Sequence, residues 1–204
     1  MRTQSAHRGN LTDLLVDRAA LDQAIDSALD SGIPARELMI SQYCAEPIRP
    51  GLFRKLSVFR AGDSLITTPA VHESCWTAKY GEKGIADDAL YEQERQMVEH
   101  NLYGEPLRAA FETGGIDYGR ADFCVVDGQP QVYEINTNPM VGRPQADHPA
   151  PDRVRSSQQF FDRLCQALRT LDDAKAPNPV QITDPLLVQQ RRRDRFLLRP
   201  RWTP

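Results

Sequence analysis

The hydrophobic pattern of the chain alternates between a period of two residues and a period of about four, which predicts both strands and helices. In the first expected helix, Leu21, Ile25 and Leu29 recur at four-residue spacing, and Asp17 can cap its amino end. The expected elements, in chain order, are a helix over 18–29, a strand over 37–44, strands over 52–60 and 64–72, a helix over 86–112 with a break near 104–106, two strands within 118–136, and a helix over 154–171. This order predicts an α+β fold.

The most informative segment lies at 118–139. Apolar and polar residues alternate from Ala121 onward, Asp127-Gly128 is a strong turn pair, and the extended pattern resumes up to Asn136. An odd number of connecting residues places Asp122 opposite Glu134 or Asn136 across the ladder. Because Glu134 and Asn136 are two residues apart, they share one face of the strand. The pattern therefore predicts that two carboxylates and an amide oxygen meet on one patch.

Carboxylates gathered in this way would repel one another and lose hydration, and a bound divalent cation removes both problems. Mg²⁺ takes oxygen ligands of this kind and completes its shell with phosphate oxygens and water. An antiparallel strand with one wet face also alternates apolar and acidic residues without any ligand. The pattern alone leaves both interpretations open.

Composition narrows the class of protein. With 40% hydrophobic and 26% charged residues, the 204-residue chain has the content of a soluble globular protein, and its formal net charge of −3 argues against wholesale nucleic-acid binding. The sequence contains no apolar run of membrane-spanning length and no signal-peptide core. Its four widely spaced cysteines fit reduced thiols, so we expect a cytoplasmic protein with no membrane partner.

Asp122-Phe123 followed by Glu134-Ile-Asn-Thr-Asn-Pro139 resembles the last active-site hairpin of the ATP-grasp superfamily. The resemblance implies that Asp122, Glu134 and Asn136 hold the Mg²⁺ ions that bridge the phosphates of ATP. It extends over roughly residues 8–170. It also implies an ATP-grasp-like sheet, mixed but largely antiparallel, flanked by helices, with an incomplete small ATP-binding subdomain.

The same resemblance implies roles for residues outside the hairpin. Gln42, Tyr43 and Cys44 resemble the hinge strand that grips adenine, and Glu46 stands where an acidic residue takes the ribose hydroxyls. Core packing explains Tyr43 and Cys44 equally well, and Glu46 can be an ordinary loop acid.

Two arginines are candidates for contact with phosphate or substrate carboxylate. Arg54 and Lys55 alternate on the strand, so only one of them faces the site, and we expect it to be Arg54; a surface ion pair is the alternative. Arg120 lies two residues before Asp122 and can balance the acidic cluster or touch phosphate. His7 and Gly9 resemble the end of a small loop that closes over the phosphates.

The chain departs from the superfamily in its amino-terminal part. ATP-grasp enzymes carry a preceding α/β domain and lysine-bearing strands, whereas no lysine precedes Lys55 in this sequence. We therefore expect residues 1–47 to be a remnant of the small ATP-binding subdomain and residues 48–174 to be the carboxy-terminal ATP-grasp subdomain. Residues 175–204 read as a basic, disordered tail. A second copy of the chain, or a separate segment that supplies the amino-terminal part, is the expected protein partner.

The resemblance implies an ATP- and Mg²⁺-dependent ligase. Such an enzyme activates a small-molecule carboxylate as an acylphosphate, which an amine or thiol then attacks. Two alternatives belong to other classes: a non-catalytic nucleotide-binding, metal-binding or structural fragment, and a protein that contacts nucleic acid through its arginine-rich tail.

Overall fold

The computed structural model describes residues 1–4 and 9–172. The predictions for His7 and for the basic tail fall outside these residues. The described elements, in order, are β1 (Arg2–Thr3), α1 (Arg18–Asp30), the 3₁₀ turn η1 (Ala35–Glu37), β2 (Leu38–Met39), β3 (Phe53–Ala61), β4 (Ser64–Thr67), β5 (Val71–Glu73), α2 (Asp88–Glu99), the 3₁₀ turn η2 (Glu105–Leu107), α3 (Arg108–Thr113), β6 (Tyr118–Val126), β7 (Gln129–Asn136) and α4 (Pro151–Asp172).

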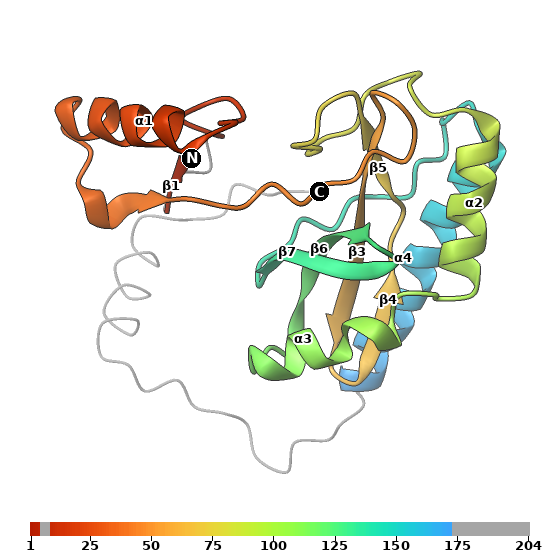
Figure 1. The fold of residues 1–204 in the computed structure, drawn as a ribbon. Helices are drawn as coiled ribbons and strands as arrows, with labels where there is room; N and C mark the ends of the chain where they lie inside the picture. Colours follow the sequence, from red (N-terminus) through yellow and green to blue (C-terminus); the bar gives the residue numbers. More distant parts are fainter. Residues whose placement is uncertain (5–8, 173–204) are drawn as a thin grey trace, which may run out of the picture.

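A five-stranded antiparallel sheet forms the main body of the fold. Its strands run in the order β4-β3-β6-β7, and β5 pairs with the other half of β3. Along β3, Leu56 and Val58 face a core that includes Phe111 of α3, while Phe59 faces a second core that includes Leu164 of α4. This alternation confirms an antiparallel sheet flanked by helices, in which α2 and α4 pack side by side (Figure 1).

Local sequence signals explain where the helices begin and end. The Asp17 side chain accepts a hydrogen bond from the Ala20 amide at 2.8 Å, so the predicted cap of α1 is confirmed. The expected helix over 86–112 is two helices, because α2 ends at Glu99 and the chain turns through Asn101, whose φ is 51°. The predicted break near 104–106 is the 3₁₀ turn that carries Pro106.

The strand expected over 64–72 is divided into β4 and β5. Thr67 pairs with Val58, and Val71 pairs with Lys55. The chain therefore advances four residues from β4 to β5 while β3 advances only three, which leaves one extra residue. The extra residue lies in the segment that contains Pro69, which cannot donate to the ladder.

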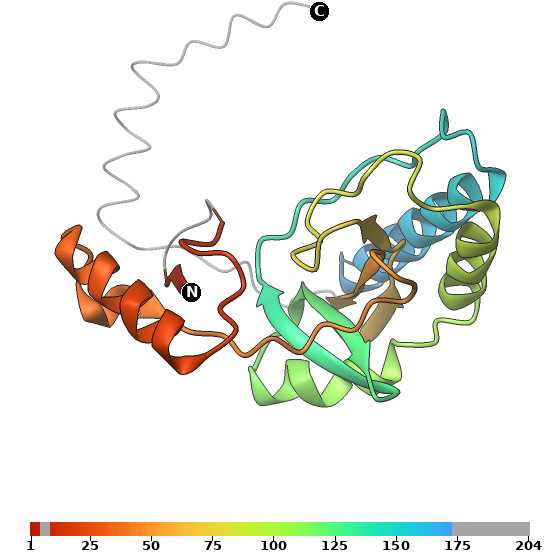
Figure 2. The ribbon, with the colours of Figure 1, turned by 45° about the horizontal axis from the view of Figure 1, so that its top comes forward.

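The amino-terminal residues form a small unit of their own. β2 pairs only with β1 among the described strands, and Ala28 is the one buried residue described before position 48. The helix α1 and these two strands lie apart from the five-stranded sheet, and residues 40–47 join the two parts (Figures 1 and 2). None of the helices in residues 1–4 and 9–172 has both the length and the apolarity needed to cross a membrane.

Candidate functional site

The hairpin of β6 and β7 brings the predicted residues together through a different geometry from the predicted one. Its turn uses Asp127 and Gly128, both with positive φ (49° and 75°), as a two-residue hairpin turn requires. Asp122 pairs with Glu134, and Asn136 lies two residues further along β7. Asp122 thus lies opposite Glu134, one of its two predicted partners, and Glu134 and Asn136 share a face as predicted. The odd-numbered connection on which that pairing was conditioned is wrong, because the connection has two residues. A β-bulge follows directly after Asp122 and shifts the register there.

Asp122 is at the centre of a dense polar network. Its Oδ1 accepts hydrogen bonds from Ser57 Oγ at 2.9 Å and Arg120 Nε at 2.7 Å. Its Oδ2 accepts from Lys55 Nζ at 3.2 Å and Arg120 Nη2 at 3.1 Å. Burial raises the pKa of Asp122, but the bonds from Arg120, Lys55 and Ser57 outweigh burial, so this pKa lies below its ordinary value. The carboxylate is therefore an anion held by two cations.

This network bears directly on the predicted Mg²⁺ site. A carboxylate offers about four lone-pair positions, and the four bonds to Asp122 occupy them. Glu134 is exposed, and no hydrogen bond or ion pair of its side chain is found within the described part of the chain. Asn136 Oδ1 accepts one bond, from the Asn138 amide at 2.9 Å. Glu134 and Asn136 thus have free oxygen lone pairs, whereas Asp122 can ligate a cation only after Arg120 or Lys55 withdraws.

No group of three or more His, Cys, Asp or Glu side chains in a metal-binding arrangement is found in residues 1–4 and 9–172. The repulsion expected between the two carboxylates is relieved here by a guanidinium and an ammonium group. The assignment of Asp122, Glu134 and Asn136 to Mg²⁺ stays a prediction.

Lys55, not Arg54, faces the acidic patch. Ser57 pairs directly with Asp122, and Lys55 shares a face of β3 with Ser57 because the two are two residues apart. Arg54 points to the opposite face, where its Nη1 lies 3.4 Å from Gln93 Oε1 on α2. The expectation that Arg54 rather than Lys55 faces the acidic patch is wrong, although Arg54 also lines the cleft beside that patch. Arg120 does balance the cluster, as predicted, through its bidentate bond to Asp122.

A narrow cleft adjoins this patch. It is lined by residues from both arms of the hairpin, from β3 and from two loops, among them Glu46, Arg54, Lys55, Trp76, Cys124 and Tyr133. Its free volume is about 10 Å³, which is about the space of a single water molecule. In this conformation the cleft is therefore closed to a nucleoside.

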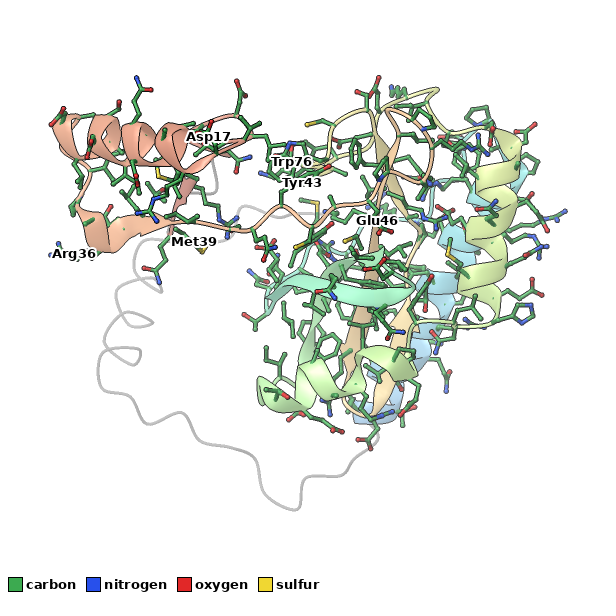
Figure 3. All side chains as sticks on the ribbon, viewed as in Figure 1. Asp17, Arg36, Met39, Tyr43, Glu46 and Trp76 are labelled. Carbon is green, nitrogen blue, oxygen red and sulfur yellow. The ribbon has the colours of Figure 1, made fainter. Side chains whose placement is uncertain are left out.

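The segment predicted as a hinge strand is not a strand, and Tyr43 reaches the cleft only through its contact with Trp76. The strand expected over 37–44 covers only Leu38–Met39, and Gln42, Tyr43 and Cys44 lie in irregular, exposed chain with no neighbouring strand to pair with. Tyr43 packs edge-on against Trp76, with ring centroids 5.4 Å apart (Figure 3). Glu46 accepts a hydrogen bond from the Asp127 amide at 3.3 Å, so it contacts the turn of the hairpin.

The loop that carries Trp76 is organised by a carboxylate that the sequence reasoning missed. Glu73 Oε1 accepts hydrogen bonds from the amides of Lys79, Tyr80 and Gly81 at 2.8, 2.6 and 2.7 Å. Burial raises the pKa of Glu73, but these three bonds outweigh burial and lower it. An acid at the end of a strand, before a glycine-containing loop, was the available signal.

The hairpin contributes two polar, uncharged side chains to the cleft. The Cys124 thiol and the Tyr133 hydroxyl are hydrogen-bonded, and burial raises the pKa of both groups above their ordinary values. Burial thus favours the neutral thiol of Cys124. Tyr133 is the extra residue of the β-bulge after Asp122, and no signal in the sequence predicts that bulge.

Comparison of the chain with protein-family models, with curated proteins and with solved structures found no match. The site is accordingly interpreted from its own geometry: a mixed-charge patch on one face of an antiparallel hairpin, beside a closed cleft with an aromatic cover.

Proposed function

We propose that this chain is an ATP-grasp-like module that binds Mg²⁺ and ATP. As a ligase it would activate a small-molecule carboxylate as an acylphosphate, which an amine or thiol then attacks. The observation that carries the proposal is the register of the hairpin. It brings Asp122 and Glu134 directly opposite each other, with Asn136 on the same face and two cations beside them.

Each group has a role in this proposal. Glu134 and Asn136 offer free oxygens to Mg²⁺, and Asp122 joins them when Arg120 turns from the carboxylate to a phosphate oxygen. A bound Mg²⁺ would supply charge neutralisation to the transferred phosphoryl group. Lys55 stays beside the site as a second cation, and the planar fork of Arg120 suits a phosphate as well as it suits a carboxylate.

Nucleoside binding requires the cleft to open. Trp76, which lines the cleft, and Tyr43, which packs against Trp76, would move away from the cleft, because the present free volume is about 10 Å³. The segment Gln42–Glu46 then lies along the opened cleft, where its backbone and the Glu46 carboxylate are available to adenine and ribose.

Calorimetric titration with Mg²⁺ and ATP tests this proposal in the full chain. The decisive variant is Glu134→Gln, because Glu134 is exposed and its loss disturbs no bond within the described residues. We expect nucleotide affinity to fall about tenfold or more in this variant, and to stay unchanged in Glu112→Gln, an exposed acid on α3. A folded wild-type chain that takes up neither ATP nor Mg²⁺ would sink the proposal.

The second candidate function is a non-catalytic module in which the acidic patch is purely structural. It is favoured by the complete occupation of Asp122 and by the closed cleft. Under this alternative, Glu134→Gln and the wild type behave alike with nucleotide, while substitution of Asp122 lowers stability alone.

A further inference from the structure

The amino-terminal unit contains an open cavity that is separate from the candidate site. One wall is the helix α1 and the other is the segment before it, and the volume is about 470 Å³. Most of the lining is apolar, including Met1, Leu11, Leu15, Ala24, Ala28 and Ile33. This volume is in the range of pockets that hold large organic groups, so side chains of a docked segment would fit.

The unit does not cover its own apolar surface. Only Ala28 is buried among the residues described before position 48, while Leu11, Leu14 and Leu29 are each more than 40% exposed and Val16 is 85% exposed. Together with the apolar lining of the cavity, these exposed side chains give the unit an apolar surface that is typical of an interaction site.

An acidic stripe runs along α1 on the flank of the helix that adjoins the cavity lining. Asp22, Asp26 and Asp30 form this stripe because they recur at four-residue spacing, and none of them lines the cavity itself. Arg18 is the single basic residue within α1, and it forms an ion pair with Asp22, with Arg18 Nε 2.8 Å from Asp22 Oδ1. The occupant that fits this surface is a segment both apolar and basic.

The chain contains such a segment at 186–202. It carries Leu186, Leu187, Phe196, Leu197, Leu198 and Trp202, together with an arginine cluster at 191–195. The thirteen residues at 173–185 that connect it to α4 can span up to about 45 Å, which exceeds the roughly 30 Å diameter of a small domain. We infer that residues 186–202 bind the cavity on α1, with apolar side chains inside it and arginines facing the acidic stripe.

Hydrogen exchange in the full chain tests this inference. Changing the four arginines at 191–193 and 195 to Gln should speed amide exchange in α1 about tenfold and leave β3 and β6 unchanged. The matched pair is Ala24→Gln, which fills the cavity, and Ala19→Gln, which lies on the exposed side of the same helix. Ala24→Gln should have the same effect as the arginine variant, and Ala19→Gln none. Amide exchange in α1 that is equally fast in the wild type and in the arginine variant would overturn the inference.

A second measurement separates docking from simple loosening of α1 by Ala24→Gln. Trp76 and Trp202 are the two tryptophans of the chain, so in a Trp76→Phe background only Trp202 fluoresces. We expect acrylamide to quench Trp202 poorly, and to quench it roughly tenfold better once Asp22, Asp26 and Asp30 are changed to Asn. The control neutralises three exposed acids elsewhere, Asp63, Glu112 and Asp162, and should have no effect. Free quenching of Trp202 in the parent, or equal responses to the two triple variants, would refute docking.

Discussion

Replacement of Asp122 by Asn is the sharpest perturbation of the candidate site. The variant keeps the size of the side chain, and Ser57 can still donate to its amide oxygen. It removes the negative charge that holds Lys55 and Arg120, whose side chains are 13% and 26% exposed. Two cations are then left in a poorly solvated position without a counter-ion.

The magnitude follows from the burial of the three groups. Removing one partner of a fully buried ion pair destabilises a protein by about 3–5 kcal/mol. Asp122 is 5% exposed, but Arg120 has a quarter of its side chain in water, so its charge is partly screened. We therefore expect the free energy of unfolding to fall by about 2–3 kcal/mol at neutral pH.

Urea unfolding followed by circular dichroism measures this change, and its pH dependence supplies an internal check. The pKa of Asp122 in the folded chain lies below its unfolded value of 3.8, so the ionised carboxylate stabilises the fold above pH 3.8. That contribution is lost as pH falls through the folded pKa, so wild type and Asp122→Asn should converge in stability in strong acid. Glu134→Gln, on the opposite strand, should unfold like the wild type throughout.

Equal stability of Asp122→Asn and wild type at pH 7 would refute this reasoning. It would mean that Lys55 and Arg120 find other partners at no cost in free energy, and that the network around Asp122 does not stabilise the fold. A loss of stability that persists unchanged in strong acid would also contradict it, because the carboxyl group is then protonated in both states.

Three further outcomes test other parts of the fold. His72 is 3% exposed, neither of its ring nitrogens has a hydrogen-bond partner among the described residues, and burial, then Arg54 and Arg153, lower its pKa to about 4. The wild type should therefore lose about 3 kcal/mol of unfolding free energy as pH falls from 6.5 to 4, and His72→Phe should not, as measured by urea unfolding at each pH. Glu94 is fully buried and bonds Arg153 at 2.9 Å, so Glu94→Gln should lower the unfolding free energy by about 3 kcal/mol in the same assay. Gly128→Ala should cost about 1 kcal/mol in thermal unfolding, because φ is 75° there and no atom obstructs the new methyl group.

The register of the hairpin could be predicted in part because two local signals agree. Alternation predicts which residues of β6 share a face, and Asp127-Gly128 predicts the turn. The pairing of Asp122 with Glu134 also needs the β-bulge after Asp122, because a two-residue turn alone would place Asp122 opposite Tyr133. Helix α1 and its Asp17 cap were predictable for the same reason, since the cap and the four-residue period both lie within a short stretch.

Features that depend on distant partners could not be predicted. Arg54 and Lys55 are adjacent, and a choice between them is a choice of register against β6, which no local signal supplies. Residues 40–44 have a strand-like sequence, but no described strand pairs with them. Glu73 is a different case: its three amide partners are only six to eight residues away, so a local signal existed, but the path of the loop decides which amides it meets.

The site residues are exposed on β7 and buried on β6, and this difference predicts the order in which a cation would meet them in the proposed binding. Helix α4 covers the face of the sheet at Phe59 and Ile66 but leaves the β6–β7 side uncovered. Glu134 therefore lies in water while Asp122, directly opposite, is 5% exposed beneath Arg120. A cation that enters from solvent meets Glu134 first, and it reaches Asp122 only after an anion has drawn Arg120 away. Mg²⁺ alone should then bind weakly, and ATP should strengthen its binding, because the phosphate supplies the anion that Arg120 needs in exchange.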